Sequence, residues 1–171
     1  MMFRRKSGPT ATNTSTALAQ AQPSNPWDDV RLQKLWLASQ RRDWRSLAVL
    51  GAGRSVNTLP IAEVLAQLAW SYRGQPSAVC DLRDLSMRLV DYQIREVSAQ
   101  VEAGARVMVS LRSIFENPTA IPVARQTDAV ILCIELAKTG MKEAEQTIAE
   151  VGHERVIGSI VIRPRAPSTV R

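Results

Sequence analysis

The chain of 171 residues is long enough for one domain with its own hydrophobic core, and its 45% hydrophobic and 22% charged residues are ordinary for a soluble globular protein. No apolar run approaches the roughly 20 residues that a transmembrane helix needs, and no apolar stretch typical of a secretory signal follows the first cations, so we expect a cytoplasmic protein. The net charge of +6 comes from residues 1–26 and 163–171, because residues 27–162 hold 16 basic and 16 acidic residues. The expected folded part therefore has no excess of basic residues that would indicate a nucleic-acid partner.

The amino-terminal segment, residues 1–26, is rich in Thr, Ser, Ala, Gln and Pro and has almost no large apolar residue. Such a composition cannot bury enough apolar surface to offset the entropy lost on ordering, so we expect a disordered, basic and polar tail. At the other end, residues 164–171 form a second basic tail that two prolines separate from the last apolar segment. The expected organisation is a single domain over residues 27–163 between these two tails.

The first segment of the domain, residues 27–44 (WDDVRLQKLWLASQRRDW), predicts a helix with a broad apolar face. Its acidic start suits the amino terminus of a helix, because carboxylates complement the helix dipole there. Asp28, Arg31 and Lys34 follow one another at intervals of three residues and so form one charged ridge. A solvent-exposed helix face and a contact with another subunit both explain this ridge, and the spacing alone leaves both open.

The central stretch, residues 47–60 (LAVLGAGRSVNTLP), predicts a buried strand, a glycine loop and the start of a helix that Gly74 ends. This layout is typical of folds that bind nucleotide phosphates on backbone N–H groups at a helix amino terminus. No Gly-Lys-Ser/Thr sequence closes the loop, so the residues that perform phosphate chemistry are missing. A degenerate nucleotide site would consist of Gly51, Gly53, Ser55, Thr58 and Asp81, and Thr58 would also cap the helix.

The rest of the chain alternates between strands and helices, which predicts an α/β fold with a doubly wound, mostly parallel sheet of about five strands. Cys80 and Cys133 lie in or beside apolar strands and are expected to be buried free thiols. The four tryptophans lie on the first two helices or near their ends, where core packing is favoured over a subunit contact. The further expected elements are strand 77–80, helix 85–103, strand 106–111, helix 119–126, strand 129–134, helix 139–151 and strand 156–162.

Several segments match one known family in order and spacing. The helix LAQLAWSYRG ends at Gly74, and Asp81 follows seven residues later. Towards the end of the chain come TDAVIL, KT and VIGSIV, which read as a strand, a helix start and a strand. Over residues 27–163 the chain thereby resembles the cytoplasmic tyrosine-kinase domain of bacterial capsule and exopolysaccharide systems, in the MinD/ParA-like class of P-loop proteins.

This resemblance implies a P-loop NTPase-like fold and suggests roles for several residues. Asp28, Arg31 and Lys34 are similar to the family's acidic-x-x-Arg-x-x-Arg oligomerisation motif, so they would contact other subunits or partners. Asp81 is similar to the first acid of the family's Asp-x-Asp motif, which belongs to its metal and phosphate machinery.

Other parts of that machinery are replaced in this chain. Leu59 stands where the family has the phosphate-loop lysine, and Pro60 stands where it has the magnesium-binding hydroxyl. Arg83 replaces the second acid of the Asp-x-Asp motif, and Ser110 replaces the acid at the end of the following strand. Phosphoryl transfer depends almost wholly on positioning and charge neutralisation by such groups, so their joint loss should abolish catalysis. The family's autophosphorylated tyrosine cluster has no counterpart either, because both tyrosines lie within predicted helices.

We therefore expect a non-catalytic, pseudokinase-like scaffold or regulatory protein of exopolysaccharide or capsule biosynthesis and export, with neither a metal nor a cofactor. The resemblance implies an inner-membrane polysaccharide co-polymerase (a chain-length regulator) or a kinase-competent relative as its partner, and it implies self-association. Basic tails suit a peripheral position at an anionic membrane surface.

Two alternatives stay open. Gly51-Ala52-Gly53 after a strand begins a dinucleotide fingerprint, and Asp81 ends the second strand where it can bind a ribose, although Val56 replaces the third glycine. The chain would then be a Rossmann-type dinucleotide-binding protein. In the other alternative, the loop holds ATP or ADP through its backbone N–H groups and does not hydrolyse it.

Overall fold

The structure is a computed structural model that describes residues 29–163. The two predicted tails lie outside the described residues, as do Trp27 and Asp28 at the start of the predicted domain.

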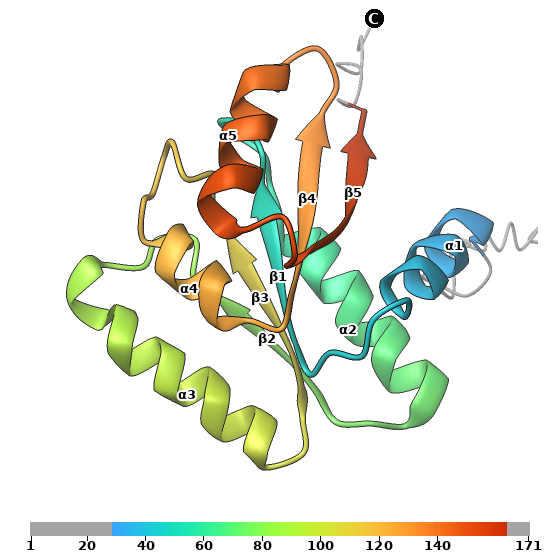
Figure 1. Cartoon of the computed structure of the whole chain (residues 1–171). Coiled ribbons are helices and arrows are strands. Elements are labelled where there is room, and N and C mark those ends of the chain that lie inside the picture. The colour runs from blue at the N-terminus through green and yellow to red at the C-terminus, as the bar shows by residue number, and fades with distance from the viewer. Residues whose placement is uncertain (1–28, 164–171) are drawn as a thin grey trace, which may run out of the picture.

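Five parallel strands form a single sheet in the order β2-β3-β1-β4-β5 (Figure 1). The central strand β1 pairs with β3 on one side and β4 on the other, so β2 lies two places away from it. The predicted α/β fold with a doubly wound sheet of about five strands is confirmed. The strands are β1 (Ser46–Gly51), β2 (Ser77–Asp81), β3 (Arg106–Leu111), β4 (Ala129–Glu135) and β5 (Val156–Ile162).

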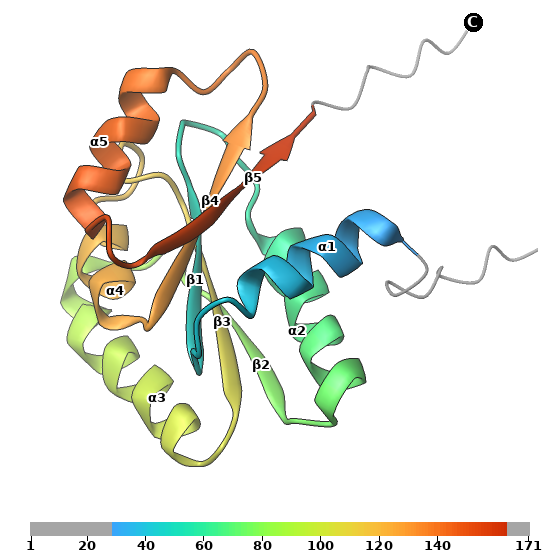
Figure 2. The same ribbon diagram turned by 45° about the vertical axis from the view of Figure 1, so that its right-hand side comes forward.

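Helices cover both faces of the sheet, two on one face and three on the other (Figures 1 and 2). The first face carries α1 (Val30–Ser39) and α2 (Leu59–Arg73), and the second carries α3 (Val90–Glu102), α4 (Ala120–Gln126) and α5 (Met141–Val151).

Each face of the sheet has its own hydrophobic core, because the side chains of a strand alternate between the two faces. In β1, Leu47 and Val49 pack with α1 and α2, whereas Ala48 and Leu50 pack with α3, α4 and α5. All six residues of β1 are buried. Burial on both faces explains why this strand reads as an unbroken apolar run in the sequence.

Two tryptophans join α1 to the sheet. Trp36 and Trp44 are buried, and their rings meet edge to face with centroids 6.3 Å apart. The Arg106 guanidinium lies over the Trp44 ring, 4.6 Å from its centroid, and Trp44 Nε1 donates to the Ser39 carbonyl. The prediction of core packing is confirmed for these two residues. It is wrong for Trp70, which is 58% exposed on α2.

The helix boundaries follow the predictions with two differences. The segment 27–44 is helical only as far as Ser39, and the residues after it form a turn into β1. The segment 85–103 begins with a separate 3₁₀ turn at Met87–Leu89 before α3. Gly74 ends α2 as predicted, with a left-handed φ of 62° and an N–H that donates to the Trp70 carbonyl.

Both cysteines are free thiols. Cys133 is buried, and burial raises its pKa to about 12. Cys80 is only half-buried, which corrects the prediction of two buried thiols; it lies on β2, an edge strand whose side chains are partly covered.

Candidate functional site

The loop between β1 and α2, residues 51–58, is the expected phosphate-binding loop. Gly51 and Gly53 are buried in it, whereas Ser55 is exposed and has a positive φ of 63°. A Cβ atom at Gly53 would lie 2.8 Å from Thr139 Oγ1. That hydroxyl accepts the backbone N–H of Glu135, so the segment that crowds Gly53 is itself held in place. The loop is therefore packed directly against the connection between β4 and α5.

The contact at Gly53 gives a testable prediction. Gly53→Ala is expected to lower the free energy of unfolding by about 1–3 kcal/mol, because the new methyl group must displace Thr139. Gly158→Ala is the matched control, since no atom lies within 4 Å of a Cβ at Gly158. Urea unfolding of both variants and of Gly53→Ala/Thr139→Ala measures the effect. Equal losses in the two single variants, or no coupling in the double variant, would contradict the contact.

Thr58 stands at the N-cap position of α2, but its side chain makes no capping hydrogen bond. Its Oγ1 lies 2.8 Å from Ser110 Oγ and donates to the Leu111 carbonyl at 2.9 Å. Thr58 and Ser110 are both fully buried. The prediction that the Thr58 side chain caps the helix is therefore wrong. Two residues at the end of β3 hold this hydroxyl inside the core.

The first residues of α2 are apolar at the two positions where the resemblance expects lysine and a hydroxyl. Leu59 is half-buried and Pro60 is exposed, and they open the helix. Proline is well placed there because a first-turn N–H has no intrahelical acceptor, but it also removes a backbone donor from the loop.

Asp81, at the end of β2, is neutralised by the chain itself. Its two carboxylate oxygens accept from Nε and Nη2 of Arg83, both at 2.8 Å. Arg83 Nη1 also donates to Asn57 Oδ1 in the loop at 2.9 Å. The hydrogen bonds from the Arg83 side chain hold the pKa of Asp81 below its ordinary value. The pair is partly exposed and stabilises the fold by less than about 1 kcal/mol. It matters because the Arg83 guanidinium lies between the Asp81 carboxylate and Asn57 of the loop.

Further ion pairs lie close to this edge of the sheet, where the strands end. Arg112, just after β3, pairs with Asp84 at 2.9 Å and lies 4.0 Å from Glu116. Lys138 pairs with Glu135 at 2.6 Å at the end of β4. Within residues 29–163 no three His, Cys, Asp or Glu side chains come together in a group that could hold a metal ion.

The five predicted site residues thus separate into two groups. Gly51, Gly53, Ser55 and Thr58 share the loop, while Asp81 lies two strands away from β1 and reaches the loop only through Arg83 and Asn57. Sequence reasoning interpreted Arg83 as the replacement of the second acid of the Asp-x-Asp motif, but it did not predict the ion pair of Arg83 with Asp81. The opposite charges of these two residues, two positions apart, were the signal that could have predicted the pair.

The predicted contact ridge is only partly described, because Asp28 lies outside the described residues. Asp29 is the N-cap of α1, and its side chain accepts from the Arg31 backbone N–H. The Arg31 guanidinium folds back onto the same carboxylate at 2.7 Å, which helps to lower the pKa of Asp29 to about 2. Lys34 is exposed.

Two residues of the predicted apolar face of α1 are not covered. Val30 is 58% and Leu37 is 60% exposed, and Lys34 lies between them on the same side of the helix. The uncovered side of α1 therefore combines apolar and basic groups.

No helix of residues 29–163 is both long and apolar enough to cross a membrane.

The chain matches no family model and no curated protein. Among solved structures it is similar to the kinase domain of Escherichia coli tyrosine kinase ETK, with a TM-score of 0.63 and 12% identity over 82% of this chain and 76% of that chain. It is also similar to the chimerical protein CapA2B2, with a TM-score of 0.56 and 8% identity over 78% of this chain and 82% of that chain. These similarities show that the chain has the fold of that kinase domain, in agreement with the α/β fold that the sequence predicted.

Proposed function

We propose that this protein is a non-catalytic member of the kinase-like fold, which acts by protein–protein association in exopolysaccharide or capsule biosynthesis and export. The polysaccharide context rests on the sequence resemblance, and the absence of catalysis rests on one observation above all. Arg83 binds both oxygens of Asp81 and reaches Asn57 of the loop, so a side chain of the protein stands where the resemblance places the ligands of a metal ion.

Phosphoryl transfer requires positive charge at the β- and γ-phosphates and a metal ion that bridges them. Leu59 and Pro60 carry no charge and no hydroxyl, and Ser110 is buried against Thr58. Each of these features removes a different part of the machinery. Together they favour a protein that neither binds Mg²⁺-ATP productively nor transfers its phosphate.

Titration of the purified full-length chain with ATP, ADP and NADH in the presence of Mg²⁺ tests this proposal by calorimetry. We expect no saturable heat for any of the three. Saturable binding of ATP or ADP without turnover would favour the alternative of a nucleotide-holding loop. Turnover of ATP that Asp81→Asn abolishes would overturn the proposal.

The dinucleotide-binding alternative is not favoured by the strand order. In the classic Rossmann sheet the second strand lies beside the first, so that its terminal acid faces the glycine loop. Here β3 lies between β1 and β2, and Arg83 already binds Asp81. Saturable NADH binding in the same titration would restore this alternative.

The surface that we propose for association is the uncovered side of α1. Exposed Val30 and Leu37 with the basic Arg31 and Lys34 offer apolar area together with positive charge. Aliphatic anchors surrounded by charges suit a protein partner better than solvent alone. In our proposal the partner is the inner-membrane polysaccharide co-polymerase, a kinase-competent relative or a second copy of this chain, and the protein works in the cytoplasm, peripherally at that membrane.

Charge reversal tests this surface. Arg31→Glu is expected to weaken self-association, or binding to the co-polymerase, by about tenfold or more, which corresponds to about 1.4 kcal/mol. Arg95→Glu on α3 makes the same charge change at an exposed residue of the opposite face and is the control. Analytical sedimentation and pull-down measure both variants, and a thermal melt shows that each is folded. Unchanged sedimentation and pull-down for Arg31→Glu would contradict the proposed contact.

A further inference from the structure

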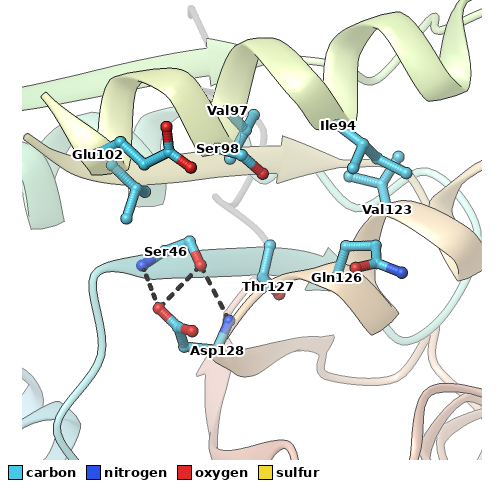
Figure 3. Close-up of a pocket in the computed structure, with 10 residues that line it drawn as sticks. Ser46, Ile94, Val97, Ser98, Glu102, Val123, Gln126, Thr127 and Asp128 are labelled. Carbon is cyan, nitrogen blue, oxygen red and sulfur yellow. Dashed lines mark hydrogen bonds between the residues drawn. The ribbon is translucent and has the colours of Figure 1, made fainter.

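A cavity of about 220 Å³ lies between α3 and α4, at the amino ends of β1 and β4 (Figure 3). Ser46 begins β1, and Thr127 and Asp128 come just before β4. Ser46 and Thr127 face α3 across the cavity, and the Asp128 carboxylate lies beyond Ser46 as seen from α3. The loop of residues 51–58 begins at the other end of β1, so the two places are separate. Pockets for small-molecule ligands usually exceed about 300 Å³, so this cavity suits a single long side chain better than a nucleotide.

The cavity combines apolar walls with acidic groups. Its apolar lining comes from α3 and α4, and its polar lining includes the acidic residues Glu102 and Asp128 but no Lys or Arg. Glu102, at the end of α3, is exposed and forms no ion pair with any residue of the described range. The apolar side chains are Ile94, Val97, Val101 and Val123.

Asp128 is held rigidly and keeps one oxygen free. Its Oδ2 accepts from the backbone N–H groups of Arg45 and Ser46, both at 2.8 Å, and from Ser46 Oγ at 3.0 Å. Its Oδ1 has no hydrogen-bond partner within residues 29–163. Partial burial raises the pKa of this carboxyl, but the bonds from Ser46 and Arg45 outweigh burial and leave the pKa below its ordinary value. The Asp128 carboxyl is therefore ionised, and its Oδ1 can accept a further hydrogen bond.

Several cations around the cavity already have partners. Arg155 donates to the carbonyl of the lining residue Thr127 at 2.7 Å and lies 3.8 Å from the Glu154 carboxylate. Arg125 on α4 donates to the Glu150 carbonyl at 2.7 Å and pairs with its carboxylate. Arg42, which exerts an attractive charge on Asp128, donates to the Glu154 carbonyl. An occupant with an aliphatic stem and a cationic head would satisfy both features of the lining, and long basic side chains have that form.

We propose that the cavity binds a basic side chain of the chain's own amino-terminal segment, Phe3-Arg4-Arg5-Lys6. Its three consecutive cations are unopposed by any acid in residues 1–26, whereas the residues between the tails are electrically neutral. An intramolecular partner benefits from a high effective concentration, so even a weak ion pair can be populated.

The length of the chain permits this contact. Twenty-three steps separate Lys6 from Asp29, where the described part begins, and they can span about 75 Å. A domain of about 135 residues has a radius of gyration of about 14 Å, so the segment can reach any face of it. The carboxyl-terminal segment is a poorer candidate. It leaves the carboxyl end of β5, whereas the cavity lies at the amino ends of β1 and β4.

Carbodiimide crosslinking of the full-length chain, followed by peptide mapping, tests the proposal. We expect the amine of Lys6 to be joined mainly to Glu102 or Asp128 within one chain. Glu102→Gln should remove the first product and lower the second by about threefold, while Glu96→Gln, exposed on the same helix, should leave both unchanged. Equal linkage of Lys6 to Glu96 and other surface acids, or linkage only between two chains, would overturn the proposal.

A second measurement does not depend on crosslinking chemistry. Reversal of Arg4, Arg5 and Lys6 to Glu should shift the backbone amide resonances of Ser98 and Thr127, beside the cavity, and leave those of the 51–58 loop in place. High salt should produce the same shifts in the unmodified chain, because it screens the attraction. Unchanged resonances at Ser98 and Thr127 in the reversed variant would overturn the proposal. Resonances that shift only when the carboxyl-terminal segment is altered would overturn it in favour of that segment.

Discussion

Replacement of Trp44 by alanine is expected to lower the free energy of unfolding by about 3–5 kcal/mol. The indole is 2% exposed, packs edge to face on Trp36 and lies beneath the Arg106 guanidinium. Its removal also leaves the buried Ser39 carbonyl without the donor at 2.9 Å. Because this cluster joins α1 to the sheet, the loss falls on the helix that carries the proposed association surface.

Trp70→Ala on α2 is the matched control. The same change there should alter the free energy of unfolding by about 0.5 kcal/mol or less, since Trp70 is 58% exposed. Urea unfolding curves of both variants measure the difference. Phenylalanine refines the comparison: Trp44→Phe should cost more than Trp36→Phe, because Trp36 Nε1 finds no acceptor within residues 29–163. Equal losses in the two alanine variants would contradict the described packing.

Ser110→Asp, which restores the acid that the kinase resemblance expects at the end of β3, should destabilise the protein by about 3–5 kcal/mol at neutral pH. Ser110 is fully buried, and its hydroxyl lies against Thr58 Oγ1, which already donates to the Leu111 carbonyl. A carboxylate there would be a buried charge without a counterion. Position 110 can therefore hold an acidic residue only if the neighbouring residues change too.

The cost of Ser110→Asp should depend on pH in a defined direction. Burial favours the neutral acid and raises its pKa in the folded state above the unfolded value of about 3.9. The destabilisation is therefore smallest below that pH, grows as the pH rises, and is complete above the folded-state pKa. Ser110→Asn, which adds similar volume without charge, should cost about 1–2 kcal/mol at every pH. An aspartate variant as stable as the asparagine variant at neutral pH would show that the position is hydrated. It would then weaken the case that the buried contact between Thr58 and Ser110 excludes a charged group from this position.

The two exposed apolar residues of α1 illustrate how local and tertiary information differ. The charged ridge of Asp28, Arg31 and Lys34 was readable from spacing, but the ion pair between Arg31 and Asp29 was not. Likewise, the sequence could not show that Val30 and Leu37 stay uncovered. Whether an apolar residue is covered depends on which element packs against it, and that is not a property of the residue's own segment.

By itself the sequence determined the elements of this protein and the residue types at the positions that the resemblance assigns to phosphate chemistry. Unbroken apolar runs, helical spacing and a glycine after a helix are local signals, because they can be read within a few residues of the sequence. They placed β1, α2 and Gly74 correctly. The residue types at Leu59, Pro60, Arg83 and Ser110, where the resemblance expects a lysine, a hydroxyl and acids, were equally readable, since a side chain has the same functional groups in any fold.

Only the tertiary structure decided what these residues contact. Three kinds of contact join residues up to 61 positions apart: the insertion of β3 between β1 and β2, the hydroxyl pair of Thr58 and Ser110, and the bridge from Asp81 through Arg83 to Asn57. The cavity between α3 and α4 likewise arises from three separate segments. Such contacts are set by the packing of whole elements on the sheet, where the same side chain can face a ligand, a neighbour or solvent without any change in the sequence around it.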